Sequence, residues 1–240
     1  MNPCELSHGA STGVTKAKET ANAPLLRSLY FLPFAVILFT RMGIECSVRL
    51  FPMRYAWIPS FLLYYGIVAV CHRFVQRGIL RGQRAVLSYA PWPVPGPKAW
   101  LFGVVLPAMP TFGFFLLNFR AVPVVLFGPI IAFALINPIF EETFWRGIMN
   151  LLPAPRWIRI LYSGFLFSFA HYSTSGAYWL SNPRVLTAVV ICTFLMGVGW
   201  MWLYQRQRTL FYPILGHAMV DVLNLSVAVF SGVQLVTVRT

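Results

Sequence analysis

The chain has 240 residues, of which 58% are hydrophobic and only 10% are charged, and its formal net charge is +13. Soluble domains carry about 25% charged residues, so this composition excludes an ordinary soluble protein and indicates a membrane protein. The positive charge does not indicate a nucleic-acid-binding protein. Its Lys and Arg residues lie mainly in short loops between apolar runs, where they act as signals of membrane topology.

A helix that crosses the membrane needs about 20 apolar residues, and the sequence contains seven such runs. In chain order they are Leu29–Phe51, Tyr55–Gln76, Ala99–Asn118, Pro123–Leu151, Trp157–Leu180, Val185–Gln205 and Thr209–Phe230. Arg41 and Glu45 interrupt the first run, but they are four residues apart and can pair on a helix. The alternative for this run is an interfacial or re-entrant piece. The pattern predicts an all-α fold, a polytopic bundle of about seven transmembrane helices.

The segments between the runs predict the sidedness of the protein. Residues 1–27 form a polar tail without the apolar core of a cleavable signal peptide. A Pro-rich loop spans Gly78–Pro97, and Ser173–Pro183 reads as a turn. Most Lys and Arg residues outside the runs fall on the same side as the tail. We therefore expect an integral membrane protein with the amino terminus in the cytoplasm and the carboxyl terminus outside. The small chain, a tail followed by a membrane core, favours the bacterial cytoplasmic membrane.

Several ionisable side chains lie deep inside apolar runs. Such groups are costly at bilayer depth and are by default functional. They are Glu141, Glu142, Arg146, His171, His217 and Asp221.

Helix geometry sorts these groups. Glu142 and Arg146 are four residues apart and share a helix face, so they can pair. Glu141 lies about 100° around the helix from Glu142, which leaves it free to act as a general base. His217, Asp221 and Asn224 stand at i, i+4 and i+7 and line one stripe of the last run. The polar groups of three runs lie at similar depths, roughly 12–21 Å from the cytoplasmic ends, so we expect them to meet in one cavity.

At these residues the sequence resembles the CAAX prenyl protease 2 and bacteriocin-processing (CPBP, or Abi) family of intramembrane proteases. That family carries a Glu-Glu-x-x-x-Arg motif, a Phe-x-x-x-His motif and a His-x-x-x-Asn/Asp motif, in this order on separate helices. In this chain they are matched by Glu141-Glu142 with Arg146, by Phe167 with His171, and by His217 with Asp221. The resemblance covers about residues 123–226.

The resemblance implies a glutamate-dependent endopeptidase that hydrolyses a peptide bond near the C-terminus or leader of a membrane-associated protein or peptide. Glu141 and His171 would activate a water, and His217 with its motif partner would stabilise the oxyanion. Asp221 departs from the more usual Asn, because an ionised carboxylate cannot donate a hydrogen bond. Either Asp221 is protonated, or it only orients His217, or Asn224 supplies the donor.

The remaining expectations concern organisation and partners. We divide the chain into a polar cytoplasmic tail (1–27), N-terminal transmembrane helices with the Pro-rich loop (28–122) and a catalytic membrane domain (123–232). No cofactor is expected. Zinc is the alternative, but HExxH is absent and neither histidine has a ligand partner at i+4 except Asp221. The expected partners are membrane lipids and a protein or peptide substrate, with or without a lipid modification, and no nucleic acid.

Two other classes of protein remain open. A proton-coupled transporter would use the same buried charges, but it predicts broken helices in paired half-repeats, and the sequence contains none. A non-catalytic scaffold or immunity protein would keep the Glu–Arg pair only to lock helices together. Such a protein would tolerate Glu141→Gln without loss of function.

Overall fold

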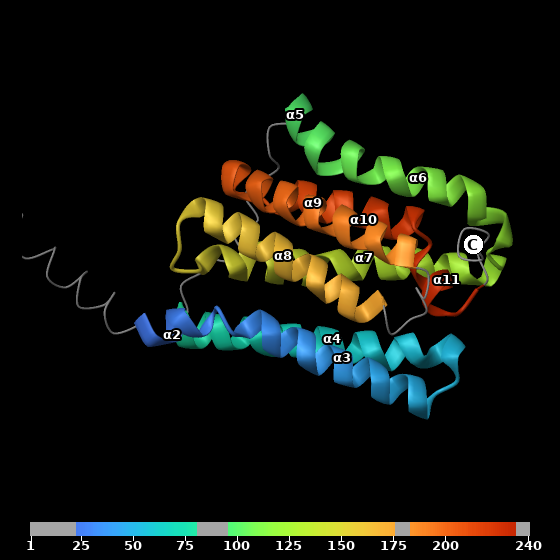
Figure 1. Ribbon diagram of the computed structural model, residues 1–240, viewed down its shortest axis with the longest axis horizontal. Coiled ribbons are helices and arrows are strands. Elements are labelled where there is room, and N and C mark those ends of the chain that lie inside the picture. Colours follow the sequence, from blue (N-terminus) through green and yellow to red (C-terminus); the bar gives the residue numbers. More distant parts are fainter. Residues whose placement is uncertain (1–22, 81–95, 176–182, 234–240) are drawn as a thin grey trace, which may run out of the picture.

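The computed structural model describes residues 23–80, 96–175 and 183–233, and within these ranges the chain is helical without a strand (Figure 1). The elements in chain order are α2 (Ala23–Ser28), α3 (Leu32–Leu50), α4 (Met53–Phe74), η1 (Val75–Ile79), α5 (Pro97–Trp100), η2 (Leu101–Val105), α6 (Leu106–Asn118), η3 (Phe119–Ala121), η4 (Val124–Leu126), α7 (Phe127–Glu142), η5 (Thr143–Ile148), η6 (Met149–Leu151), α8 (Arg156–Ser175), α9 (Pro183–Gln207), α10 (Phe211–Leu223) and α11 (Ser226–Phe230). The predicted all-α fold is confirmed.

In the part of the chain that the structure describes, five helical segments are long and apolar enough to cross a membrane, and they match five of the predicted runs. They are Leu25–Leu50, Met53–Ile79, Pro97–Ala121, Val124–Leu151 and Pro183–Gln207. Apolar runs of this length become helices because only a helix or a closed barrel satisfies every backbone group inside lipid. The structure is therefore a polytopic membrane-type bundle.

The first segment is a full helix and not a short re-entrant piece. Within α3 the predicted pair forms, with Arg41 Nε donating to Glu45 Oε1 at 2.7 Å. Arg41 also donates from a terminal nitrogen to the backbone oxygen of Ser173 at 2.6 Å. This cation therefore neutralises its helix neighbour and ties α3 to the end of α8.

The helices stack side by side, with the α3–α4 hairpin along one side of the bundle and α6 along the other (Figure 1). Helix α8 packs against α9, and the short helix α10 contacts α6, α7 and α9. Because α10 is enclosed by other helices, its 13 residues suffice even though they are too few to cross the bilayer alone.

Glycines allow two of these contacts to be unusually close. A Cβ on Gly164 of α8 would lie 2.7 Å from a methyl carbon of Val198, and one on Gly197 of α9 would lie 2.8 Å from Gly164 Cα. A Cβ on Gly216 of α10 would lie only 1.8 Å from the backbone oxygen of Gly103. Small residues at helix crossings are the usual means of close packing in membranes.

We predict that Gly216→Ala lowers the unfolding temperature in detergent clearly, because overpacking of this kind costs about 1–3 kcal/mol or more. Thermal unfolding of the purified protein measures the effect. Gly113→Ala on α6 is the matched control, since a Cβ there meets nothing within 4 Å. Equal unfolding temperatures for the two variants would mean that α10 does not approach η2 as closely as described.

Two predicted runs differ from the structure. The run Thr209–Phe230 is not one helix: α10 ends at Leu223, and Leu225 adopts a left-handed conformation with φ 55 before α11 begins. The run Trp157–Leu180 forms α8, which is not among the five span-like helices, because Arg156 and Arg159 in its first turn and the polar residues near its end lower its hydropathy.

Several predictions fall outside the described residues. These are most of the polar tail, most of the Pro-rich loop and the centre of the turn before α9, which cover residues 1–22, 81–95 and 176–182. The division into three parts stays a prediction. Helix α9 begins at Pro183, the last residue of the predicted turn, which agrees with the preference of proline for the first helical position.

Candidate active site

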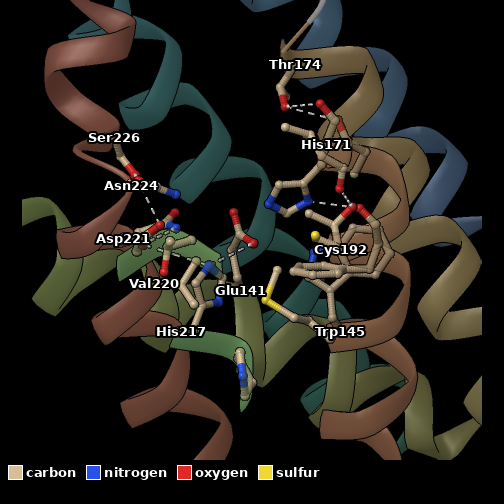
Figure 2. A pocket seen from close by; sticks show the side chains of 18 of the residues that line it. Glu141, Trp145, His171, Thr174, Cys192, His217, Val220, Asp221, Asn224 and Ser226 are labelled. Carbon is tan, nitrogen blue, oxygen red and sulfur yellow. Dashed lines mark hydrogen bonds and ion pairs between the residues drawn. The ribbon is translucent and has the colours of Figure 1, made fainter. Parts of the chain in front are cut away.

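Polar side chains from α7, α8 and α10 meet at one place in the bundle (Figure 2). Glu141, His171 and His217 each offer one nitrogen or oxygen atom, and these atoms all lie within 4.8 Å of one another. Glu141 and His217 are buried, and His171 is partly buried. The predicted convergence of three separate runs is therefore confirmed, and one water can reach all three groups.

Glu142 links α7 to α10 through its side chain. Its side chain is fully buried, with Oε2 lying 2.9 Å from Arg146 Nε and Oε1 accepting a hydrogen bond from His217 Nδ1 at 2.8 Å. The predicted pairing of Glu142 with Arg146 is thus present. The additional bond to His217 was not foreseen, because it joins residues that are 75 positions apart.

Aromatic rings enclose the guanidinium of Arg146. Its central carbon lies 4.2 Å from the ring centroid of Phe167 and 5.2 Å from that of Trp200, both within the range of cation–π attraction. Among the described residues, neither terminal nitrogen of Arg146 has a hydrogen-bond partner. Arg146 lies in the π-helical segment η5, a type of turn that is frequent at functional sites and that the sequence pattern did not predict.

Both histidines present the same ring nitrogen to the site. His171 donates from Nδ1 to the backbone oxygen of Phe167 at 2.9 Å, and Figure 2 shows its other nitrogen facing Glu141. His217 uses Nδ1 for Glu142, and its Nε2 lies 3.9 Å from Glu141 Oε2 and 3.8 Å from Asp221 Oδ2. In each ring the acceptor at Nδ1 fixes the orientation, so Nε2 is the working atom.

Aromatic side chains hold the His217 ring in place. Trp200 stacks on it with centroids 5.2 Å apart and an angle of 24°, and Phe167 meets it edge-on at 6.0 Å. Trp200 is itself anchored by a hydrogen bond from Nε1 to the backbone oxygen of Gly103 at 2.9 Å. Phe167 also contacts the ring of His171 at 4.4 Å, so this motif residue packs between both histidines and Arg146.

Two residues that the sequence did not single out, Asn137 and Ser226, lie within hydrogen-bond distance of the Asp221 carboxylate. Asn137 Nδ2 donates to Oδ2 at 3.1 Å, and Ser226 Oγ lies 3.2 Å from Oδ1. The Ser226 hydroxyl has one hydrogen, and its shorter contact is to Asn224 Oδ1 at 2.5 Å. Asn137 could have been found as an amide inside an apolar run, one turn before Glu141. Ser226 could not, because it reaches Asp221 only through the break at Leu225.

The site opens into a cavity of about 610 Å³. Glu141, His171, His217, Asp221 and Asn224 line it, whereas Glu142 and Arg146 lie behind its wall. Most of the remaining lining is apolar and comes from α3, α4, α6 and α9, and no Lys or Arg of the described residues lines it. The candidate catalytic residues therefore face a largely hydrophobic cavity, whose carboxyl groups are those of Glu141 and Asp221.

The donor set of the site also fits a metal ion in composition. Zinc takes His and carboxylate ligands, and ligating histidines usually donate their other ring N–H to a carboxylate or a carbonyl, as both do here. The absence of ligand spacing along one helix does not exclude zinc, because the three donors come from three helices. Their spread of up to 4.8 Å exceeds the roughly 3.4 Å between ligands of a tetrahedral zinc site, so binding would require the side chains to move inward.

Comparison with protein families gives one match. The family described as type II CAAX prenyl endopeptidase Rce1-like matches residues 123–223, a range that contains Glu141, His171, His217 and Asp221. Neither the comparison with curated proteins nor that with solved structures gave a match. The matching family is one of proteases, which supports a peptidase with a protein or peptide substrate. Residues 123–223 of the chain are thus similar to the Rce1-like type II CAAX prenyl endopeptidases, and this supports the resemblance to CAAX proteases that the motifs indicate.

Proposed function

We propose that this protein is a glutamic-type intramembrane endopeptidase. It hydrolyses a peptide bond near the C-terminus or in the leader of a membrane-associated protein or peptide. The observation that carries the proposal is the convergence of Glu141 with both histidines at the wall of an apolar cavity. An apolar cavity suits an apolar substrate segment or one that bears a lipid.

In this mechanism a water molecule lies between Glu141 and His171. Two groups that bind the same water can lie about 5 Å apart, which agrees with the spacing of these side chains. Glu141 takes a proton from the water while the oxygen of the water adds to the peptide carbonyl carbon. The second hydrogen of the water is donated to His171 Nε2. Glu141 then gives the proton to the leaving nitrogen as the C–N bond breaks.

The oxyanion of the tetrahedral intermediate needs a donor on the opposite side. His217 can supply it from Nε2, because Glu142 holds Nδ1–H and fixes the ring. The surrounding carboxylates of Glu141, Glu142 and Asp221 would stabilise the positive charge of a protonated His217. One donor of this kind typically contributes about 10²–10³ in rate.

The test is peptidase activity of the purified protein in detergent against a peptide library. Wild type is compared with Glu141→Ala, His171→Ala and His217→Ala, and thermal unfolding shows that each variant is folded. We expect cleavage by the wild type and a loss of at least about 10² in each variant. Activity that survives all three substitutions would remove the proposed chemistry.

We predict that the reaction needs no metal. Prolonged treatment with a chelator such as EDTA, followed by elemental analysis of the protein, is expected to leave kcat unchanged. The reason is that the water is activated here by Glu141 and His171 rather than by a Lewis acid. Loss of activity on chelation that returns on addition of Zn²⁺ would show instead that the three donors bind a metal.

For topology, we propose that the amino terminus faces the cytoplasm of a bacterial cell. The ends of α4 and α9 and the start of α8 lie at the same end of the bundle (Figure 1). Exposed arginines occur there in sequence: Arg77 in η1 just after α4, Arg156 at the start of α8 and Arg206 near the end of α9. An excess of basic residues at one end supports a cytoplasmic location of that end.

A further inference from the structure

Asp221 stands where an amide donor would serve the proposed reaction, yet its carboxylate can only accept. Both of its oxygens have a donor nearby, Asn137 at Oδ2 and Ser226 at Oδ1. An oxyanion needs hydrogen-bond donors, so an ionised Asp221 cannot contact it favourably. With Asp221 ionised, the donor has to come from a neighbouring side chain.

Asn137 meets the geometric requirements for that donor. It lies on α7 four residues before Glu141, so both side chains point to the same helix face. It is 3% exposed, and it lines the same cavity as Glu141 and His217. Its side chain therefore belongs to the wall of the cavity in which the substrate carbonyl would bind.

Two partners fix the orientation of the Asn137 amide. Nδ2 donates to Asp221 Oδ2 at 3.1 Å, and Oδ1 accepts from the hydroxyl of Tyr65 at 3.4 Å. The reversed amide would place Oδ1 against a carboxylate oxygen, which is repulsive, so Asp221 sets which end of the amide faces it. Tyr65 belongs to α4, which brings a helix of the amino-terminal half to the site.

The amide nitrogen has one hydrogen to spare. Nδ2 carries two hydrogens, and among the described residues only Asp221 accepts from it. The same Asp221 oxygen lies 3.1 Å from Asn137 Nδ2 and 3.8 Å from His217 Nε2, so both donor nitrogens lie beside this one carboxylate oxygen. A charged acceptor on one N–H also polarises the amide and strengthens what the other N–H can donate.

We propose that Asn137 is a catalytic residue of this site, whose carboxamide donates to the oxyanion together with His217, and that Asp221 positions both donors. Helix α7 thus supplies the amide donor, Asn137, and helix α10 carries the carboxylate that orients it, Asp221. This inference rests on the proposed peptidase function.

An exchange of the two side chains tests the proposal. Kinetics of the purified full-length protein are compared for Asn137→Ala, Asn137→Asp, Asp221→Asn and the double variant Asn137→Asp/Asp221→Asn. We expect Asn137→Ala to lower kcat about 10²-fold with little change in KM, and Asn137→Asp to lower it further because two carboxylates then face each other. Asp221→Asn should lower kcat less than tenfold, since the amide oxygen of the new side chain can still accept a hydrogen bond from Asn137. The double variant returns one amide and one carboxylate to the site and should recover at least tenfold over Asn137→Asp.

Ser47→Ala provides the control for a buried polar group outside the cavity, because the Ser47 hydroxyl donates to the backbone oxygen of Gly43 in its own helix. It should keep the wild-type kcat. The proposal is overturned if Asn137→Ala keeps at least half of the wild-type kcat. It is also overturned if kcat falls only in step with the unfolding temperature and the exchange recovers nothing. A wild type that cleaves no peptide would contradict the proposed function instead, which keeps the two failures distinct.

Discussion

Glu141→Gln is expected to lower kcat by about 10³-fold or more while leaving the unfolding temperature close to that of the wild type. Glutamine has the same shape and can fill the same buried position, but it cannot take a proton from water. The loss therefore reports the chemistry and not the fold. Single-turnover cleavage of the best library peptide, measured beside thermal unfolding, gives both quantities for one preparation.

Glu45→Gln is the matched control for this substitution. Glu45 is also a glutamate on an apolar helix, but it is exposed on α3, pairs with Arg41 and does not line the cavity. We expect it to keep wild-type activity. If Glu141→Gln were fully active, the general base would lie elsewhere, and the non-catalytic scaffold that tolerates this change would become the better reading.

Arg146→Met is expected to produce the largest loss of stability. Removing one partner of a buried ion pair costs about 3–5 kcal/mol, because the other charge remains buried without compensation. Glu142 would keep only His217 as a partner, and the rings of Phe167 and Trp200 would lose the cation that they enclose. The unfolding temperature in detergent should fall sharply, and the yield of folded protein should fall with it.

Two further variants show whether the unpaired charge of Glu142 causes the loss of stability in Arg146→Met. Arg206→Met removes an arginine that is exposed beside Trp202, and it should cost less than about 1 kcal/mol. Glu142→Gln added to Arg146→Met removes the uncompensated carboxylate and should recover part of the lost stability. An Arg146→Met protein as stable as the wild type would mean that Glu142 does not depend on the guanidinium.

Much of the candidate site could be predicted because it depends on local geometry. Glu142 and Arg146 pair because they are one turn apart, and Glu141 leaves that face because it is the adjacent residue. Ionisable residues are so costly inside an apolar run that their presence alone predicted which three helices carry the candidate site. The same reasoning predicted the Arg41–Glu45 pair in α3.

Other features could not be predicted because they depend on contacts between distant segments. The bond from Asn137 to Asp221 joins residues that are 84 positions apart, and the sequence contains no local sign of it. Likewise, a run of hydrophobic residues does not show that the chain turns at Leu225, which brings Ser226 to Asp221. The zinc question is of the same kind, because ligand spacing within one helix says nothing about donors that three helices bring together.

The sequence by itself determined that the chain forms membrane-type helices and which ionisable groups they carry into the apolar interior. Both follow from the energetic cost of exposing backbone or charge to lipid, which every residue meets independently of its distant neighbours. Only the tertiary structure decided which helix faces turn toward one another. That choice depends on the packing of side chains such as Phe167 and Trp200 and on close backbone contacts such as Gly216 with Gly103, which arise only once the helices are assembled.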